Sequence, residues 1–150
     1  MKIALGADHR GIEARIHLAE LLVRLGHEVT VCTECNNNRS CDYPDVAYPV
    51  ALAVVEGRSH RGILICGTGI GMSIAANKID GVRAALCHDE IAAEVSRRHN
   101  DANVLCLSGD MLGLRVMDRI VQTWLRTEFE GGRHARRLQK SPPSSKAKTP

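Results

Sequence analysis

The sequence predicts a three-layer, doubly wound α/β fold, with a five-stranded parallel sheet that carries helices on both faces. Two observations predict it. Short apolar runs alternate with segments of helical spacing from the first residues almost to the end, and turn residues follow each apolar run. Such alternation is typical of consecutive βαβ units, whose strands join one parallel sheet. We therefore expect a Rossmann-like arrangement in which ligands bind beyond the carboxyl ends of the strands.

Five short runs of β-branched and aliphatic residues are the expected strands. They cover residues 2–5, 28–32, 62–66, 83–87 and 103–107. Apolar residues three and four positions apart predict helices over residues 12–25, 44–56, 70–78, 91–99 and 112–126. A basic cluster of helical spacing follows Gly131 and Gly132 and predicts an additional C-terminal helix. The expected order is therefore β-α repeated five times, closed by that helix.

Length and composition indicate one domain and exclude nucleic acid as a partner. At 150 residues with 44% apolar content, the chain can bury one sizeable core. We expect a single domain over residues 1–139 and a disordered tail over residues 140–150, which is rich in proline, serine and lysine. The net charge is only +3 and aromatic residues make up 3%, so neither a basic surface nor a base-stacking platform is expected.

The sequence shows no signal-peptide core, and no apolar stretch is long enough to span a membrane. These observations predict a cytoplasmic protein without a membrane partner. In that compartment the six cysteines are expected to be thiols rather than a disulfide framework. Cys32, Cys35 and Cys41 could offer metal ligands, but a fourth ligand is not evident and their spacing is incomplete for zinc. No metal is therefore expected.

The segment from Ile63 to Ser73 is the most informative part of the chain. An apolar strand runs into Gly67, Gly69 and Gly71 and then into a helix, so several backbone N–H groups face one spot. Such a spot favours a negatively charged ligand. The glycines follow the pattern G-x-G-x-G on the third strand, which is a poor match to the dinucleotide fingerprint G-x-G-x-x-G on a first strand.

Cys66 lies where the third strand enters this glycine turn. The amides of the turn should stabilise its thiolate, and a thiolate in this place can act as a base. The alternative is a small buried residue that completes a strand, which is how we interpret Cys32, Cys87 and Cys106.

A polar cluster ends the fourth expected helix just before the fifth strand. His99 and Asn100 in this cluster could complement the helix dipole and cap the helix. A histidine also titrates near neutral pH, so His99 could instead act as an acid on a ligand. Arg133 and Arg137 share one face of the expected C-terminal helix. They could clamp one phosphate, or they could form a solvated basic surface.

Six separated segments form one ordered set of motifs. They are Gly6-Ala7-Asp8-His9-Arg10-Gly11, Asp42-Tyr43-Pro44-Asp45, Ile65-Cys66-Gly67-Thr68-Gly69-Ile70-Gly71, Ser73-Ile74-Ala75-Ala76-Asn77-Lys78, Arg98-His99-Asn100-Asp101 and Glu130-Gly131-Gly132-Arg133-His134. Together they resemble the RpiB/LacAB family of sugar-phosphate isomerases over nearly the whole ordered chain. The resemblance implies an aldose–ketose isomerase that interconverts ribose 5-phosphate and ribulose 5-phosphate through a cis-enediolate, in the non-oxidative pentose phosphate pathway. It implies no metal or organic cofactor, and a homodimer or homotetramer with shared active sites.

The resemblance also assigns a role to each candidate residue. Cys66 would move a proton from C2 of the open-chain sugar to C1, and His99 would open the furanose ring. The turn that supports the enediolate would consist of Gly67, Thr68, Gly69, Ile70 and Gly71. The sugar and its phosphate would be held by Asp8, His9, Asn100, Arg133 and Arg137.

One position departs from the family's pattern. Relatives often carry an arginine after the fifth strand that helps to hold the phosphate, whereas this chain has Asp110. Arg10 could supply the missing charge, or Asp110 could turn away and cap a helix that begins near Met111. Two other functions also stay open: an isomerase of allose or galactose 6-phosphate, and a non-catalytic module that binds phosphate or a nucleotide.

Overall fold

The fold is given by a computed structural model, which describes residues 1–33 and 40–141. Its five strands all run parallel, in the order β2-β1-β3-β5-β4. They are β1 (Lys2–Ala7), β2 (Glu28–Thr33), β3 (Arg61–Cys66), β4 (Ala84–Leu86) and β5 (Val104–Ser108). The predicted parallel sheet is confirmed, and the strand ends differ from the expected ones by no more than two residues.

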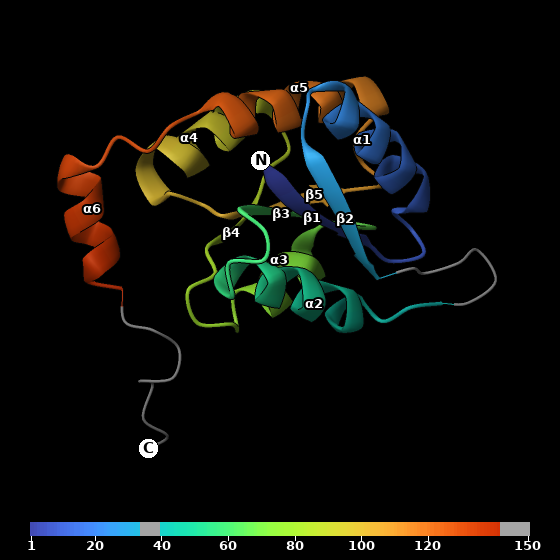
Figure 1. Cartoon of the computed structure of the whole chain (residues 1–150), viewed down its shortest axis with the longest axis horizontal. Helices are drawn as coiled ribbons and strands as arrows, with labels where there is room; N and C mark the ends of the chain where they lie inside the picture. The colour runs from blue at the N-terminus through green and yellow to red at the C-terminus, as the bar shows by residue number, and fades with distance from the viewer. Residues whose placement is uncertain (34–39, 142–150) are drawn as a thin grey trace, which may run out of the picture.

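Six helices accompany the sheet in the described part of the chain. They are α1 (Ile12–Arg24), α2 (Tyr43–Val55), α3 (Ile70–Ala76), α4 (Glu90–Asn100), α5 (Leu114–Arg126) and α6 (Gly132–Gln139). Figure 1 shows α1, α4 and α5 on one face of the sheet and α2 and α3 on the other, which confirms the predicted three layers. None of the described helices is both long enough and apolar enough to cross a membrane.

Side chains of the strands alternate between the two faces of the sheet and build two cores. Ile3 and Leu5 of β1 belong to the core under α1, α4 and α5, whereas Ala4 between them belongs to the core under α2 and α3. The same alternation holds along β3 and β5. Because helices cover both faces, both sets of side chains are apolar, and each strand is a continuous apolar run in the sequence.

The carboxyl ends of β1 and β3 are neighbours in the sheet, and the chain leaves them toward opposite faces. The segment after β1 leads to α1 on one face, whereas the segment after β3 leads to α3 on the other (Figure 1). Doubly wound sheets bind their ligands at such a switch point. The fold therefore places a ligand site at the loops that begin with Asp8 and Cys66.

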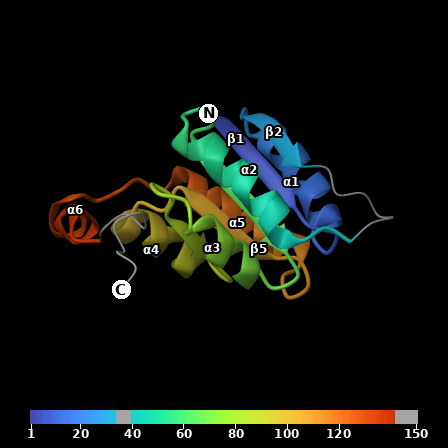
Figure 2. The same ribbon diagram turned by 90° about the horizontal axis from the view of Figure 1, so that it is seen from below.

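The predicted C-terminal helix is present as α6, which lies to one side of the sheet and contacts α4 (Figures 1 and 2). Gly131 and Gly132 have φ angles of 66° and 54°, which side chains rarely adopt, so glycine is needed where the chain turns into α6. The Glu130 amide donates to the Arg98 carbonyl at 3.1 Å and ties this turn to α4. Residues 142–150 of the predicted tail lie outside the described residues.

Candidate active site

β3 ends at Cys66, and the chain then turns sharply into α3. Gly69 in this turn has a φ of 76°, and a Cβ atom there would lie 2.5 Å from the Leu86 Cδ1 and 3.0 Å from the Leu107 carbonyl carbon. Only glycine fits this position. The Gly69 amide donates to the Cys66 Sγ at 3.1 Å. The thiol predicted at the edge of the glycine turn is therefore in direct contact with an amide of that turn.

The turn is held in place by polar contacts with the loop after β5. The Gly67 carbonyl accepts a hydrogen bond from the Asp110 amide at 3.1 Å and another from the Ser108 hydroxyl at 2.6 Å. Within the turn, the Thr68 hydroxyl accepts from the Ile70 amide at 3.3 Å. These contacts fix the peptide planes, so the amides of the turn are oriented in advance for a ligand.

The other free thiols have a different environment from Cys66. Burial raises the pKa of Cys87 to about 11 and raises the pKa of Cys106 well above its ordinary value. Burial also raises the pKa of Cys32. All three are therefore protonated at neutral pH and suit the interpretation as small apolar residues of the strands and their ends.

Cys41 contradicts the prediction that all six cysteines are thiols. Cys41 is disulfide-bonded, whereas the free cysteines of the described residues are Cys32, Cys66, Cys87 and Cys106. A disulfide sulfur is not a thiolate ligand, so the zinc site considered for the Cys32–Cys41 segment is wrong as far as Cys41 is concerned. Cys35 lies outside the described residues. The prediction rested on the expected compartment alone, which does not show whether two sulfurs lie close enough to bond.

The loop after β1 places Asp8 and His9 beside the turn. The Asp8 amide donates to the Ile65 carbonyl at 3.1 Å, so Asp8 stands next to the end of β3. Its carboxylate accepts from the Arg10 amide at 2.9 Å, and the residue is buried. Burial raises the pKa of Asp8, although the Arg10 amide opposes this shift. His9 is exposed, and its Nδ1 accepts from the Cys41 amide at 3.4 Å.

Arg10 and Asp110 form an ion pair at the border of the turn. The Arg10 Nε lies 3.1 Å from both carboxylate oxygens of Asp110, and its Nη2 lies 2.7 Å from Oδ2. That Oδ2 is 2.8 Å from the place where a Cβ atom on Gly67 would stand. The idea that Asp110 caps a helix is wrong, because α5 begins only at Leu114 with Gly113 as its cap. Arg10 therefore neutralises a carboxylate beside the turn.

His99 belongs to a second group of polar residues, on α4 and α6. Its ring stacks on the ring of His134, with centroids 4.1 Å apart and planes 5° apart. The Glu130 Oε2 lies 3.9 Å from the His99 Nε2 and 3.6 Å from the His134 Nε2. Burial lowers the pKa of His134, and the nearby His99 and Arg133 lower it further. His134 is therefore neutral at pH 7 beside the more exposed His99.

The ring nitrogens of His99 and His134 and a carboxylate oxygen of Glu130 lie within 4.8 Å of one another, as the ligands of a metal ion would. Their surroundings suit a cation poorly. The Arg98 Nε donates to the Glu130 Oε1 at 2.6 Å, and the Arg133 Nε donates to the His134 Nε2 at 3.3 Å. Guanidinium groups attract carboxylates and phosphates, so this group is better suited to an anion.

The group with Cys66 lies at the carboxyl ends of the strands, whereas the group with His99 lies at their amino ends. α4 ends at Asn100, and the chain then enters β5 at Val104, which is the amino end of that strand. Cys66 pairs with Ser108 at the other end of β5. The rise between Val104 and Ser108 is roughly 13 Å. A single chain therefore does not bring His99 to Cys66.

The candidate residues divide between these two groups. The group at the carboxyl edge contains Asp8, His9, Cys66, Gly67, Thr68, Gly69, Ile70 and Gly71. The group at the end of α4 and on α6 contains His99, Asn100, Arg133 and Arg137. Both arginines and Asn100 are exposed.

Three further residues belong to these groups although spacing alone gave them no role. Glu130 and His134 surround His99, as described above. Tyr43 covers the beginning of α3, since a Cβ atom on Gly71 would lie 3.0 Å from its ring. All three occur inside the six motifs, which is the one sequence signal that could have pointed to them.

A thiol and a fixed glycine turn at the switch point of a doubly wound sheet define an α/β protein that is built to hold an anionic ligand. The family model described as Ribose/Galactose Isomerase matches residues 3–141, and the chain belongs to this family. It is thus an isomerase of sugar phosphates, as the resemblance of the six motifs implied.

Named relatives cover almost the whole chain. "Ribose-5-phosphate isomerase B" of Escherichia coli is 46% identical over 138 residues, which are 92% of this chain and 92% of the relative. "D-erythrulose-4-phosphate isomerase" of Pectobacterium atrosepticum is 41% identical over 140 residues, 93% of this chain and 92% of the relative. The solved structure of Clostridium thermocellum ribose-5-phosphate isomerase B is 49% identical with a TM-score of 0.91, and covers 93% of this chain and 94% of that chain. The names differ in the sugar.

Proposed function

We propose that this protein interconverts ribose 5-phosphate and ribulose 5-phosphate through a cis-enediolate, with Cys66 as the base. The observation that carries this proposal is the 3.1 Å hydrogen bond from the Gly69 amide to the Cys66 Sγ at the switch point. This hydrogen bond holds the sulfur at the switch point, next to the turn that would bind the ligand. The cytoplasmic location and the place in the pentose phosphate pathway stay predictions from the sequence.

The proton transfer needs one base and a site that supports negative charge. The Cys66 thiolate removes the proton from C2 of the open-chain aldose, and the electron pair moves onto the C1 oxygen. The amides of the turn and the Thr68 hydroxyl stabilise this enediolate. The thiol then returns the proton to C1, while a proton moves from the C2 oxygen to the C1 oxygen. The products of these steps are the ketose and the regenerated thiolate.

Ring opening is the second chemical task, because ribose 5-phosphate is mostly a furanose. We assign it to His99, which would protonate the ring oxygen. Neutral His134 stacks against its ring, and Glu130 lies beside both histidines. Asn100 would hold the sugar, and Arg133 and Arg137 would bind its phosphate. The Arg98 and His134 side chains of the same group also favour an anionic ligand there.

The proposed site requires a second copy of the chain, since His99 and Cys66 lie at opposite edges of one sheet. The outer faces of α2 and α3 are the surface that we propose for such a copy. These two packed helices expose large apolar side chains, namely Tyr48, Leu52, Val55, Ile70 and Ile74. Exposed apolar side chains that gather on one surface are typical of protein interfaces. We therefore propose a homodimer, or a homotetramer built from such dimers, in which one copy supplies Cys66 and the other supplies His99.

Other sugars remain candidates for the same chemistry. A relative is named for erythrulose 4-phosphate, and the family model is described by ribose and galactose. Allose or galactose 6-phosphate is therefore the alternative substrate. Membership of an isomerase family argues against the non-catalytic module.

Initial rates on four substrates test the proposed sugar. We expect the highest kcat/KM for ribose 5-phosphate among ribose 5-phosphate, erythrose 4-phosphate, allose 6-phosphate and galactose 6-phosphate. A roughly tenfold preference corresponds to the 1–3 kcal/mol that one carbon unit contributes in a fitted pocket. A higher kcat/KM for either hexose phosphate would replace ribose 5-phosphate by that sugar, and a higher value for the tetrose would point to a four-carbon substrate.

The ion pair at the turn leads to a prediction on Arg10. Arg10→Ala should raise the KM for the sugar phosphate by roughly tenfold, because an unscreened Asp110 carboxylate would repel an anion a few ångströms away. The double variant Arg10→Ala/Asp110→Asn should recover most of this loss, since neither charge is left. If the double variant is as impaired as Arg10→Ala, then Arg10 contacts the phosphate directly. An unchanged KM in Arg10→Ala would exclude both roles.

A further inference from the structure

Asp101, which directly follows α4, has an unusual backbone conformation. It follows α4 with φ 46° and ψ 43°, and it is the one non-glycine residue with positive φ among the described residues. Most side chains avoid this left-handed conformation, although aspartate and asparagine adopt it more readily than others, notably at the end of a helix. His99 and Asn100 directly precede Asp101. Whatever fixes Asp101 therefore also fixes the direction in which these two residues leave α4.

Arg97 holds Asp101 from inside the protein. Its side chain is only 2% exposed, and its Nη1 donates to the Asp101 Oδ1 at 2.8 Å and to the Ala102 carbonyl at 2.6 Å. Its Nε reaches the Thr127 carbonyl at 3.4 Å. The Arg97 guanidinium also lies over the ring of the fully buried Trp124, 5.9 Å from its centroid. This contact anchors the arginine in the core.

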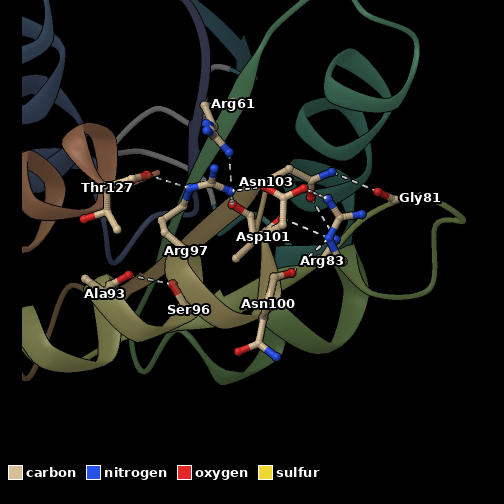
Figure 3. Close-up of polar contacts among 11 residues, drawn as sticks. Arg61, Gly81, Arg83, Ala93, Ser96, Arg97, Asn100, Asp101, Asn103 and Thr127 are labelled. Carbon is tan, nitrogen blue, oxygen red and sulfur yellow. Dashed lines mark hydrogen bonds and ion pairs between the residues drawn. The ribbon is translucent and has the colours of Figure 1, made fainter. Parts of the chain in front are cut away.

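Arg83 holds Asp101 from the other side (Figure 3). Its Nη2 donates to the Asp101 Oδ2 at 2.8 Å, and its Nε reaches the carbonyls of Asn100 and Asp101 at 3.1 and 2.9 Å. The Asn103 side chain in turn fixes Arg83, because its Oδ1 accepts from the Arg83 amide at 2.8 Å. A third guanidinium, that of Arg61, reaches the Ala102 carbonyl at 3.3 Å. Three consecutive carbonyls after His99 are thus bound by arginines.

Part of this arrangement is buried. Two guanidinium groups bind the Asp101 carboxylate and that of Arg61 lies nearby, where burial together with the Arg97 charge lowers the pKa of Arg61. Buried charges carry a desolvation cost, and apolar side chains of similar size often stabilise a fold as well or better. What the arginines add is geometry, because each donates in fixed directions to named carbonyl and carboxylate oxygens.

We propose that Asp101, Arg83 and Arg97 are positioning residues for ring opening, which hold the end of α4 so that His99 and Asn100 project toward the substrate. In Figure 3 the Asn100 side chain points away from the three arginines while its carbonyl faces Arg83. Asp101, Arg83 and Arg97, which we call the clamp, thus bind the backbone and leave the Asn100 side chain available to a ligand. This inference rests on the proposed role of His99 in opening the sugar ring.

Asp101→Ala tests the clamp, because it removes both ion pairs and puts alanine in the left-handed conformation. Asp101→Asn is the milder variant, since asparagine tolerates positive φ but carries no charge. The control is Arg119→Gln, which removes the Arg119–Glu90 ion pair at the other end of α4. Thermal melting shows whether each variant is folded. If Asp101→Ala does not fold, the comparison is made with Asp101→Asn.

The kinetic measurement compares a cyclic with an acyclic substrate. Erythrose 4-phosphate cannot form a furanose because its O4 carries the phosphate, so it needs no ring opening. We expect kcat on ribose 5-phosphate to fall at least tenfold in Asp101→Ala and several-fold in Asp101→Asn, with less than a twofold change on erythrose 4-phosphate. An equal fall on both substrates would show that the residue only supports the fold, and no fall on either would also overturn the proposal.

A measurement without turnover separates this inference from the proposed function. The carbon-bound ring protons of His99 should have shifted NMR signals because the ring stacks on His134. We expect these signals to move toward those of a free histidine in the Asp101 variants and to stay in place in Arg119→Gln. Unchanged His99 signals in a folded Asp101→Ala protein would overturn the clamp. Inactive wild-type protein with shifted signals would instead overturn the proposed substrate and leave the clamp supported.

Discussion

Replacing Cys66 by serine is expected to remove turnover of the sugar phosphate while its binding is retained. A hydroxyl is far less acidic than a thiol, so serine at this position cannot serve as the base, whereas its size and its contact with the Gly69 amide are preserved. Loss of a general base lowers kcat by roughly 10²–10⁴-fold. Steady-state kinetics on ribose 5-phosphate and calorimetric titration with the same sugar measure the two quantities.

Cys32→Ser is the matched control for this experiment. Cys32 is also a strand thiol, but burial raises its pKa and its Sγ contacts the Thr30 carbonyl rather than the glycine turn. We expect its kcat to remain within about twofold of wild type, as for surface substitutions away from a functional site. A Cys66→Ser protein that retains wild-type kcat would end the role of Cys66 as the base. A protein that loses both turnover and binding would indicate a structural role for this thiol.

Mixing two inactive variants should restore activity if two copies share each site. Cys66→Ser and His99→Asn are each expected to be nearly inactive on ribose 5-phosphate alone. In a mixed dimer, one site contains both substitutions and the other contains neither. Random reassortment of equal amounts should therefore recover about one quarter of the wild-type activity, because half of the dimers are mixed and each has one intact site.

The reassortment experiment has a direct internal control. Mixing Cys66→Ser with the double variant Cys66→Ser/His99→Asn should restore nothing, since no combination of these chains contains an intact Cys66. Size-exclusion chromatography with light scattering establishes whether dimers are present in each mixture. If confirmed mixed dimers of the two single variants stay inactive, the shared site is wrong, and His99 must act within its own chain or not at all.

The fold could be predicted in detail because its signals are local. Apolar spacing of three and four residues, and short aliphatic runs closed by turn residues, depend only on neighbours along the chain. These patterns correctly predicted all five strands and the helices between them. The ends of strands and helices were predicted less accurately. β4 has only three residues, and α5 begins at Leu114 rather than at residue 112, because Gly113 and not an earlier residue caps it.

The candidate site could be predicted only in part. The strand end at Cys66 and the turn at Gly69 follow from adjacent residues, and the structure places them in contact as expected. The partner of Asp110 could not be decided, since Arg10 is 100 positions away and only the packing of two loops brings them together. The disulfide of Cys41 was missed because the prediction rested on the expected compartment, which does not show whether two sulfurs approach each other.

The sequence by itself determined the order of strands and helices, the apolar cores and the position of a thiol before a glycine turn, because each depends on residues a few positions apart. Only the tertiary structure decided that Cys66 and His99 lie at opposite edges of the sheet, and that Arg83 and Arg97 hold Asp101 beside His99. These facts depend on strand order and on contacts between distant segments. Ion pairs and hydrogen bonds act through space over a few ångströms, and a linear pattern does not encode such distances.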